Sequence, residues 1–386
     1  MKKKSSKNIS RINTLSSFVG VPFNDTLESF LDTHEIGENI ECYQLLYCPY
    51  ASGTSFNDLN QIEFSSRVVI LNIMDSIVDE YDNLDIKQIT QFCKNHSEQN
   101  FIIFNVHLDL QKQFNIPNLY FDSIIPTSFA SNFTPVEKKE ISNRWISLNR
   151  NTKLHKILAI CYLLSKDYYR NGDISVRMDE STLSTFPQYK NISDVAILSN
   201  ELKRTLTKGF TRFKEKDFNL LSIDDFAKND DRVANNYNTN IKPAYENVGI
   251  EIIPGSIFFE RSPLLSEKEL QSIYGQNFPI YLNGPGMVKG IKSYLDIDTF
   301  DDIIDHSYDE IENPFERLAA AIDRNETLLN GSTNISELWH DNEKRFKDNV
   351  DRLDNFMHDK TCQRTYNHGK IKKALEHFKV SVSDKV

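Results

Sequence analysis

Short apolar runs alternate with helical spacing in the first third of the chain. Three of these runs are rich in β-branched and aromatic residues, as strands buried on both faces are, and they span Glu41–Tyr47, Arg67–Ile73 and Asn100–Val106. Residues 86–96, between the last two runs, have the spacing of an amphipathic helix. This alternation predicts parallel strands joined by crossover helices. We therefore expect an α/β domain over residues 13–140, preceded by a disordered basic arm over residues 1–12.

A second α/β pattern begins after a Pro-containing stretch. Trp145–Leu148 predicts a short strand, and the residues from Lys153 onward have helical spacing. Residues 264–295 then predict a helix, an apolar strand, a Gly-Pro-Gly turn and another helix. We expect this second domain to span residues 141–334 and a helical segment to follow over residues 335–386.

The composition excludes several classes of protein. The 386 residues carry a net charge of −10, and the longest apolar runs are far shorter than the roughly 20 residues of a membrane helix. The basic N-terminus has no apolar core after it, unlike a secretory signal. The five Cys form no CxxC motif and the nine His no HExxH motif, which argues against disulfides and structural zinc. We expect a cytoplasmic protein without a membrane span.

Two segments are basic although the chain is acidic. Residues 203–216 and residues 360–379 each hold six Lys or Arg and one Glu. They predict either directed attraction to phosphate or two solvated helix faces. Phe210 and Phe213 interleave the first segment, as bases stacking on a protein would require. The candidate contacts with an acceptor or a nucleic acid are Lys203, Arg204, Lys208 and Arg212.

A basic cluster follows the strand at 145–148, where a helix begins. Cations at a helix N-terminus oppose the helix dipole and are stabilised by an anion between them. Arg offers a bidentate fork for phosphate and Lys a point charge. The cluster is therefore a candidate diphosphate clamp, the alternative being a solvated helix end, and its residues are Asn149, Arg150, Lys153, His155 and Lys156.

The segment from residue 264 to residue 309 holds further candidates. Ser266 and Glu269 form the pattern of a capping box, which leaves Glu267 free to accept ribose hydroxyls and Lys268 to reach a phosphate. Gly284 and Gly286 flank a proline in a strand-to-helix turn, where helix N–H groups would be free for a ligand. Alternatively, these features are a surface helix start and an ordinary turn. The acidic run that follows includes Asp296 and Asp298, which either cap a helix or hold a divalent metal.

These segments resemble a glycosyltransferase-like family of bacteriophages and bacteria. The resemblance rests on the order of SLNRNTKLHK, SEK, the NGPG turn and SYD, and the second block is also similar to the donor-binding region of α-fucosyltransferase-type enzymes. Lys156 stands where the family has Arg. The resemblance implies two Rossmann-like domains facing a cleft (GT-B type), with the C-terminal helices returning to the N-terminal domain. It implies donor-binding roles for Asn149, Arg150, His155, Lys156, Glu267, Lys268 and Tyr308.

The expected activity is transfer of a sugar from a nucleotide-sugar to an acceptor hydroxyl. The cations and helix N–H groups would stabilise the leaving diphosphate, so no tightly bound cofactor and no metal are expected. A base must deprotonate the acceptor, and the strand ends of the N-terminal domain offer Asp75, His107 and Asp109. The acceptor is either a glycan or a hydroxymethylated base in phage DNA, which would place the enzyme in the host cytoplasm. The alternatives are an inactive nucleotide-binding scaffold of the same fold and a metal-dependent transferase that uses Asp296 and Asp298.

Overall fold

The computed structural model describes residues 11–14, 22–45, 63–73, 84–105, 114–123, 133–149, 154–176, 199–221, 237–255, 263, 265–358 and 360–385. The chain divides into two compact units. Unit 1 comprises residues 1–128 and 355–386, and unit 2 comprises residues 129–354. The last 32 residues therefore belong to the same unit as the N-terminus, and the chain returns to it later than the predicted residue 335.

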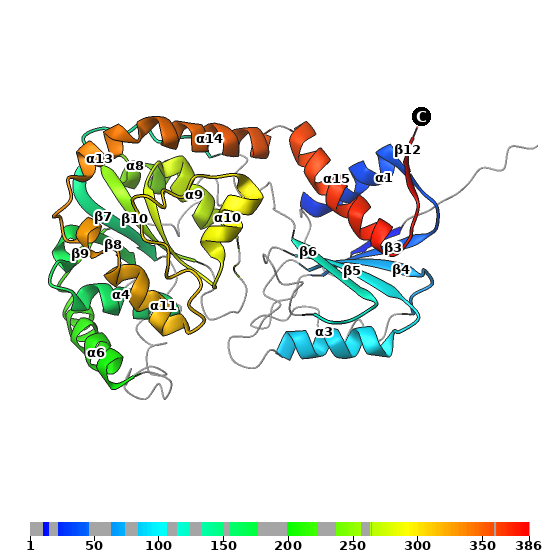
Figure 1. The fold of residues 1–386 in the computed structure, drawn as a ribbon, viewed down its shortest axis with the longest axis horizontal. Coiled ribbons are helices and arrows are strands. Elements are labelled where there is room, and N and C mark those ends of the chain that lie inside the picture. The colour runs from blue at the N-terminus through cyan, green and yellow to red at the C-terminus, as the bar shows by residue number, and fades with distance from the viewer. Residues whose placement is uncertain are drawn as a thin grey trace, which may run out of the picture. The chain divides into compact units, whose positions relative to one another are not determined.

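Unit 1 is a parallel sheet with helices on both faces (Figure 1). Its sheet runs in the order β1-β3-β4-β5-β6, with strands β1 (Arg11–Thr14), β3 (Ile40–Leu45), β4 (Val68–Ile73), β5 (Asn100–Asn105) and β6 (Leu119–Ser123). The other elements are α1 (Pro22–Thr33), β2 (His34–Ile36), α3 (Leu84–Asn95), α15 (Lys360–His377) and β12 (Val382–Asp384), which pairs antiparallel with β2. Strand β1 begins inside the predicted basic arm, and residues 1–10 lie outside the described part.

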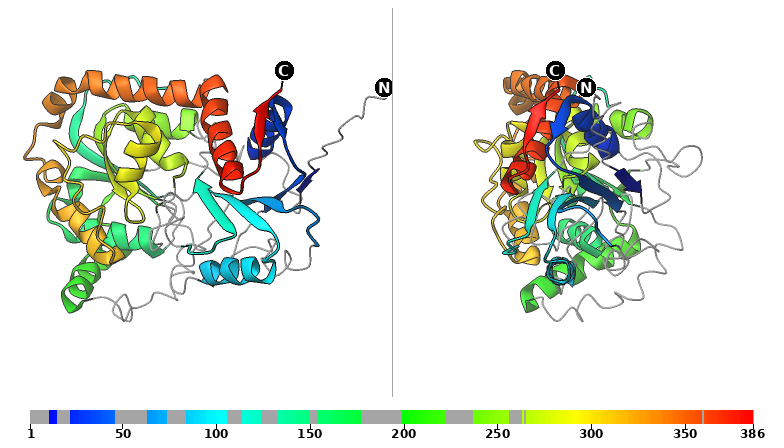
Figure 2. Two further views of the ribbon diagram at one scale, coloured as in Figure 1. Left: turned by 45° about the vertical axis from the view of Figure 1, so that its right-hand side comes forward. Right: turned by 90° about the vertical axis from the view of Figure 1, so that its right-hand side faces the viewer.

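Alternation along the central strands of unit 1 divides the core into two layers. Val69 and Leu71 of β4 pack in the layer under α3, whereas Val68 and Ile70 pack in the opposite layer. That second layer takes Ile371, Ala374 and Leu375 from α15 and Leu27 and Phe30 from α1. Figure 2 shows α15 in red beside α1 in blue. Both faces of the sheet are thus apolar because each is covered by helices.

Unit 2 is a second parallel sheet, in the order β11-β10-β7-β8-β9 (Figure 1). Its strands are β7 (Ser142–Asn149), β8 (Gly172–Val176), β9 (Asn219–Leu220), β10 (Val248–Pro254) and β11 (Phe278–Leu282). Its helices are α4 (Leu154–Ser165), η3 (Tyr169–Asn171), α6 (Asn200–Glu215), η6 (Tyr237–Ile241), α8 (Lys242–Tyr245), α9 (Glu267–Gly275), α10 (Met287–Leu295), α11 (Pro314–Asp323), α12 (Glu326–Leu329), α13 (Ile335–Asp341) and α14 (Glu343–His358), which runs past the end of the unit.

The core of unit 2 lies mainly between the sheet and helices α4, α6 and α11. Ile250 and Ile252 of β10 meet Ile157 and Ile160 of α4 in this core, while α9 covers the opposite face. Gly209 of α6 is packed so closely on α4 that a Cβ there would lie 1.7 Å from the carbonyl oxygen of Cys161. The mixed α/β class with parallel sheets, predicted from the sequence, is confirmed. Two domains facing a cleft stay a prediction.

Candidate functional site

The strand order of unit 2 reverses between β7 and β10. From β7 the chain proceeds outward through β8 and β9, and it then returns to add β10 and β11 on the other side. In open α/β sheets, ligands bind beyond the carboxyl ends of the strands at such a reversal. Here the two strands end at Asn149 and Pro254. The sheet of unit 1 runs in chain order and has no such reversal among its described strands.

His155 connects the two strand ends at this point. It lies in the first turn of α4 with 2% of its surface exposed, and its Nε2 is 3.0 Å from the carbonyl oxygen of Gly255, directly after β10. A carbonyl only accepts, so Nε2 carries the proton and donates. This nitrogen therefore holds the start of α4 against the end of β10 across 100 residues of sequence, and it is not available to a ligand.

Lys268 pairs with the carboxylate of Glu267, and the charge of Lys156 acts on the same carboxylate. The Lys268 ammonium is 2.6 Å from Glu267 Oε1, and each of these two side chains is about one quarter exposed. Burial alone would raise the pKa of Glu267, but the ammonium groups of Lys268 and Lys156 hold it below its usual value. Lys156 is only 3% exposed. The structure thus brings together the two predicted segments, HK on α4 and EK on α9.

Ser266 and Glu269 form the predicted capping box at the start of α9. Glu269 Oε2 accepts from the Ser266 amide at 2.9 Å and from the Ser266 hydroxyl at 2.7 Å. The hydroxyl in turn accepts from the Lys268 amide at 3.4 Å. The other carboxylate oxygen of Glu269 accepts from Asn283 Nδ2 at 2.9 Å, so the box extends to the turn after β11.

The turn around Gly284 and Gly286 is held by its own chain. Asn283 Oδ1 accepts from the Gly284 amide at 2.7 Å, and Gly286 has a positive φ of 83°. Asp309 Oδ2 accepts from the amides of Val288 and Lys289, in the first turn of α10, at 3.0 and 3.3 Å. The expectation that the N–H groups at this helix start are free is therefore wrong for these two, because a carboxylate already occupies them.

Tyr308 supports the edge of the sheet. It is 0% exposed, and its hydroxyl accepts from the amide of Tyr281, in edge strand β11, at 3.0 Å. The structure thus shows a supporting role for this hydroxyl, and the donor-binding role of Tyr308 stays a prediction. Arg317, also buried, donates from Nε to the carbonyl oxygen of Asn283 at 2.9 Å. Asp309 belongs to the SYD motif of the sequence analysis, whereas no sequence signal distinguished Arg317 or Gly255 as parts of the site, because their partners are far away in the chain.

Five of the residues proposed from the sequence lie outside the described part of the structure. They are the three candidate bases and two cations of the clamp: Asp75, His107, Asp109, Arg150 and Lys153. Asn149 is described and fully buried, and its Nδ2 donates to the Ser147 hydroxyl at 3.0 Å. No described residue donates to its Oδ1. Asn149 thus keeps a buried acceptor at the end of β7.

The basic helix α6 has both structural and exposed cations. Arg212 donates to the carbonyl oxygens of Leu164 and Lys166 at 2.5 and 3.1 Å and covers the ring of Tyr169. It therefore fastens the end of α4. Lys208 pairs with Asp167 at 3.2 Å, while Arg204 is exposed and Lys203 is partly exposed.

Phe210 and Phe213 do not interleave the basic face of α6. They are 9% and 1% exposed and belong to the core of unit 2. The expectation that they stack on bases is wrong, because with Leu206 they form the apolar side of an amphipathic helix.

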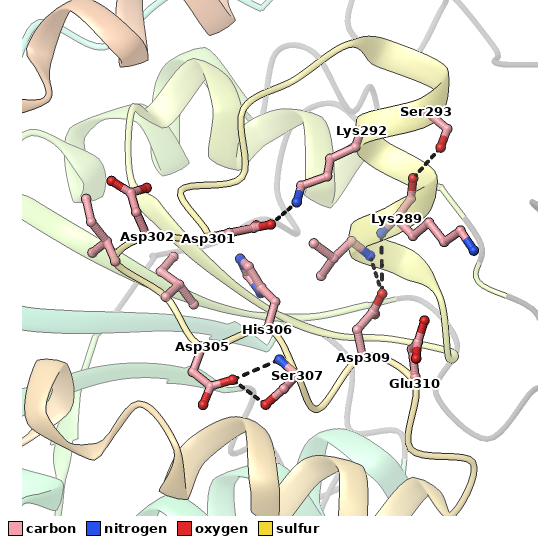
Figure 3. Close-up of a pocket in the computed structure, with 13 residues that line it drawn as sticks. Lys289, Lys292, Ser293, Asp301, Asp302, Asp305, His306, Ser307, Asp309 and Glu310 are labelled. Atoms are coloured by element: carbon pink, nitrogen blue, oxygen red, sulfur yellow. Dashed lines mark hydrogen bonds and ion pairs between the residues drawn. The ribbon is translucent and has the colours of Figure 1, made fainter.

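A cavity of about 720 Å³ lies beside α10 (Figure 3). It is lined by α10 and the segment from Asp301 to Glu310. Lys292 pairs with Asp301 across it, and His306 Nε2 is 2.9 Å from the carbonyl oxygen of Thr299. Most of its polar groups are thus bonded within the wall. The sequence did not predict this cavity.

The candidate metal ligand Asp298 is held by an arginine. Arg345 Nε and Nη2 donate to its two carboxylate oxygens at 2.7 and 3.0 Å, and Asp296 is almost fully exposed. In the described ranges, no group of three or more His, Cys, Asp and Glu is placed to hold a metal. No helix in the same ranges is long and apolar enough to cross a membrane.

Comparison with known proteins gives weak structural likeness and no match in sequence. No family model matches the chain, and no curated protein does. A solved structure of a DNA-modifying enzyme, β-glucosyltransferase, studied with and without its substrate uridine diphosphoglucose, is similar over 95% of this chain and 98% of that one. The identity is 11% and the TM-score 0.37. At this TM-score the likeness assigns neither a fold nor a function.

Proposed function

We propose that the protein is a glycosyltransferase that takes a sugar from a nucleotide-sugar. The observation that carries this proposal is the ion pair of Lys268 with Glu267 at the start of α9, close enough to α4 for the charge of Lys156 to act on the same carboxylate, beside the reversal of the unit 2 sheet. Two cations and a carboxylate, mostly shielded from water, match a nucleoside diphosphate, whose phosphates need cations and whose ribose needs an acceptor.

The proposed chemistry follows from these charges. As the bond between sugar and diphosphate breaks, negative charge grows on the leaving diphosphate and an oxocarbenium-like state forms. Lys156 and Lys268 would stabilise that charge, and they act more strongly where water is excluded. Glu267 would accept from the ribose hydroxyls. Arg150 and Lys153 follow β7 in the sequence and would add cations on the same side.

The acceptor requires a base and a binding surface. We propose the base among Asp75, His107 and Asp109, of which His107 has the ordinary pKa best suited to neutral pH. The exposed cations of α6, Lys203 and Arg204, favour a polyanionic acceptor such as DNA over an uncharged glycan. A base inside a duplex would have to leave the stack to react.

An inactive nucleotide-binding scaffold is the second candidate. The same cations would bind a nucleotide without transferring a sugar, so the two candidates differ only in turnover. A thermal-shift panel of UDP, GDP, CDP, ADP and their sugars tests binding, because a ligand at 100 times its Kd stabilises a fold by about 2.7 kcal/mol. Release of the nucleoside diphosphate from the stabilising nucleotide-sugar, with acceptor present, then supports the transferase. Binding without release supports the scaffold, and no shift with any nucleotide contradicts both.

A further inference from the structure

The carboxylate of Glu269 links the start of α9 to the turn after β11. The side chain is 0% exposed and accepts from the Ser266 amide, the Ser266 hydroxyl and Asn283 Nδ2, all within 2.9 Å. A capping box needs only the first of these contacts, and such boxes are usually on the surface. Burying a carboxylate is costly unless its oxygens are bonded, so this extended arrangement needs a reason beyond capping.

The orientation of Asn283 is fixed by its other contacts. Its Oδ1 accepts from the Gly284 amide at 2.7 Å, and its backbone oxygen accepts from Arg317 at 2.9 Å. Only Nδ2 is therefore left to face Glu269. The contact is also tight, because a Cβ on Gly255 would lie 2.5 Å from Asn283 Nδ2 and 3.2 Å from Glu269 Oε1.

We propose that Glu269 is a positioning residue of the nucleotide site. It sets Glu267 and Lys268, the two residues before it in α9, at a fixed place relative to the end of β11, and it does not touch the nucleotide itself. This inference rests on the proposed function and deepens it. Gly255 packs against both Glu269 and Asn283, and its carbonyl oxygen accepts from His155. The same set of contacts therefore includes α4, on which Lys156 lies.

An exchange of side chains tests this role. In Glu269→Gln, the new amide group faces Asn283 Nδ2, so two donors oppose each other. In Asn283→Asp, two carboxylates oppose each other. In the double variant, the oxygen of the new glutamine side chain can still accept from Ser266, and its nitrogen can donate to the new aspartate. That aspartate can still accept from the Gly284 amide. The double variant therefore keeps these hydrogen bonds and moves the negative charge from residue 269 to residue 283.

The measurement is isothermal titration of each variant with UDP, GDP, CDP and ADP, followed by KM and kcat with the sugar of the nucleotide that binds. We expect each single variant to bind that nucleotide about tenfold more weakly and the double variant to recover to within about threefold, since one lost hydrogen bond corresponds to about a factor of ten. KM should rise in the single variants with a smaller change in kcat. Tyr162→Phe is the control, because it removes a 2.7 Å hydrogen bond to Asp323 in the same unit.

The outcomes separate this inference from the proposed function. Wild-type affinity in all the folded variants, or loss in the single variants that the double variant does not recover, would overturn the positioning role while leaving the nucleotide site in place. Equal loss in Tyr162→Phe would show general destabilisation and overturn it too. A wild-type protein that binds none of the four nucleotides would overturn both.

Discussion

His155 Nε2 donates to the carbonyl oxygen of Gly255 at 3.0 Å, across the point where the strand order of unit 2 reverses. One residue follows β7 and the other follows β10, so a single hydrogen bond joins the two elements that border the candidate site. Lys156 is the next residue on α4. The effect of its charge on Glu267 therefore depends on where this contact holds the start of α4.

Replacing His155 should weaken the link between α4 and β10 and lower the stability of unit 2 without unfolding it. In His155→Ala the buried carbonyl of Gly255 loses its donor, which should lower the free energy of unfolding by about 1–3 kcal/mol. His155→Gln keeps a donor and should lose less. Urea unfolding of both variants measures this difference. Equal stability of the two variants would show that the hydrogen bond contributes nothing.

Gly255 should not tolerate a side chain. In Gly255→Ala the new Cβ would lie 2.5 Å from Asn283 Nδ2 and 2.9 Å from Asn283 Cγ, so the turn must shift, at a cost of about 1–3 kcal/mol. Gly369 is the matched control. It lies in α15 with nothing within 4 Å of its Cβ position, so Gly369→Ala should stabilise by about 0.5–1 kcal/mol. Thermal unfolding of both proteins tests the pair, and a neutral Gly255→Ala would contradict the packing described.

The stability of unit 2 should depend on pH through Glu251. This buried carboxylate on β10 accepts from the Tyr245 hydroxyl at 2.6 Å, and burial raises its pKa from 4.5 to about 7. Nearby, Lys138 Nζ donates to the oxygens of Tyr245, Val248 and Asn277, while burial lowers the pKa of this amine well below its usual value and the charge of Glu251 opposes that shift.

The sign of this dependence follows from the raised pKa. Between pH 4.5 and about 7 the folded protein keeps a proton on Glu251 that the unfolded chain has released. The contribution of Glu251 to stability is therefore greatest below pH 4.5 and falls as the pH rises to about 7, by an amount on the order of 3 kcal/mol. Urea unfolding at pH 5, 6 and 7.5 should show this fall in the wild type and not in Glu251→Gln. Parallel curves for the two proteins would contradict it.

The basic residues of α6 should separate into two kinds. Lys203→Ala and Arg204→Ala should leave the fold intact, and each should reduce the salt dependence of DNA binding by about one unit of slope if each contacts one phosphate. Arg212→Ala should instead destabilise unit 2, because its guanidinium holds the carbonyl oxygens of Leu164 and Lys166. Fluorescence anisotropy with a DNA duplex at several salt concentrations, with unfolding as a control, measures both effects. DNA binding that does not change with salt would exclude this surface as a phosphate contact.

Strands that are continuous apolar runs could be predicted from the sequence. Strands whose surroundings come from distant segments could not. Strands β4 and β5 were predicted because both of their faces are apolar. Strand β6 was missed, because part of its environment comes from α15, where Lys370 pairs with Asp122 at 2.7 Å, 248 residues away. The arm predicted over residues 1–12 also included the start of β1, which pairs with the distant strand β3.

The candidate site shows the same division. The pairs His155–Lys156 and Glu267–Lys268, together with the capping box, could be found from local sequence, because each is a short motif. The hydrogen bond from His155 to Gly255 and the hydrogen bonds of Asp309 with the first turn of α10 could not be found, because the partners lie 100 and 21 residues away. The burial of Phe210 and Phe213 could have been found, since their spacing with Leu206 places all three on one helix face.

Titration of the wild type and Lys268→Gln with UDP, GDP, CDP and ADP tests the central claim most directly. Lys292→Gln is the matched control, since Lys292 lies on α10 and pairs with Asp301, whereas the partner of Lys268 is Glu267. The account predicts that one nucleotide binds the wild type and the control alike, and that it binds Lys268→Gln at least tenfold more weakly, about 1.4 kcal/mol. Equal affinity of all three proteins, or no binding of any nucleotide by the wild type, would contradict it.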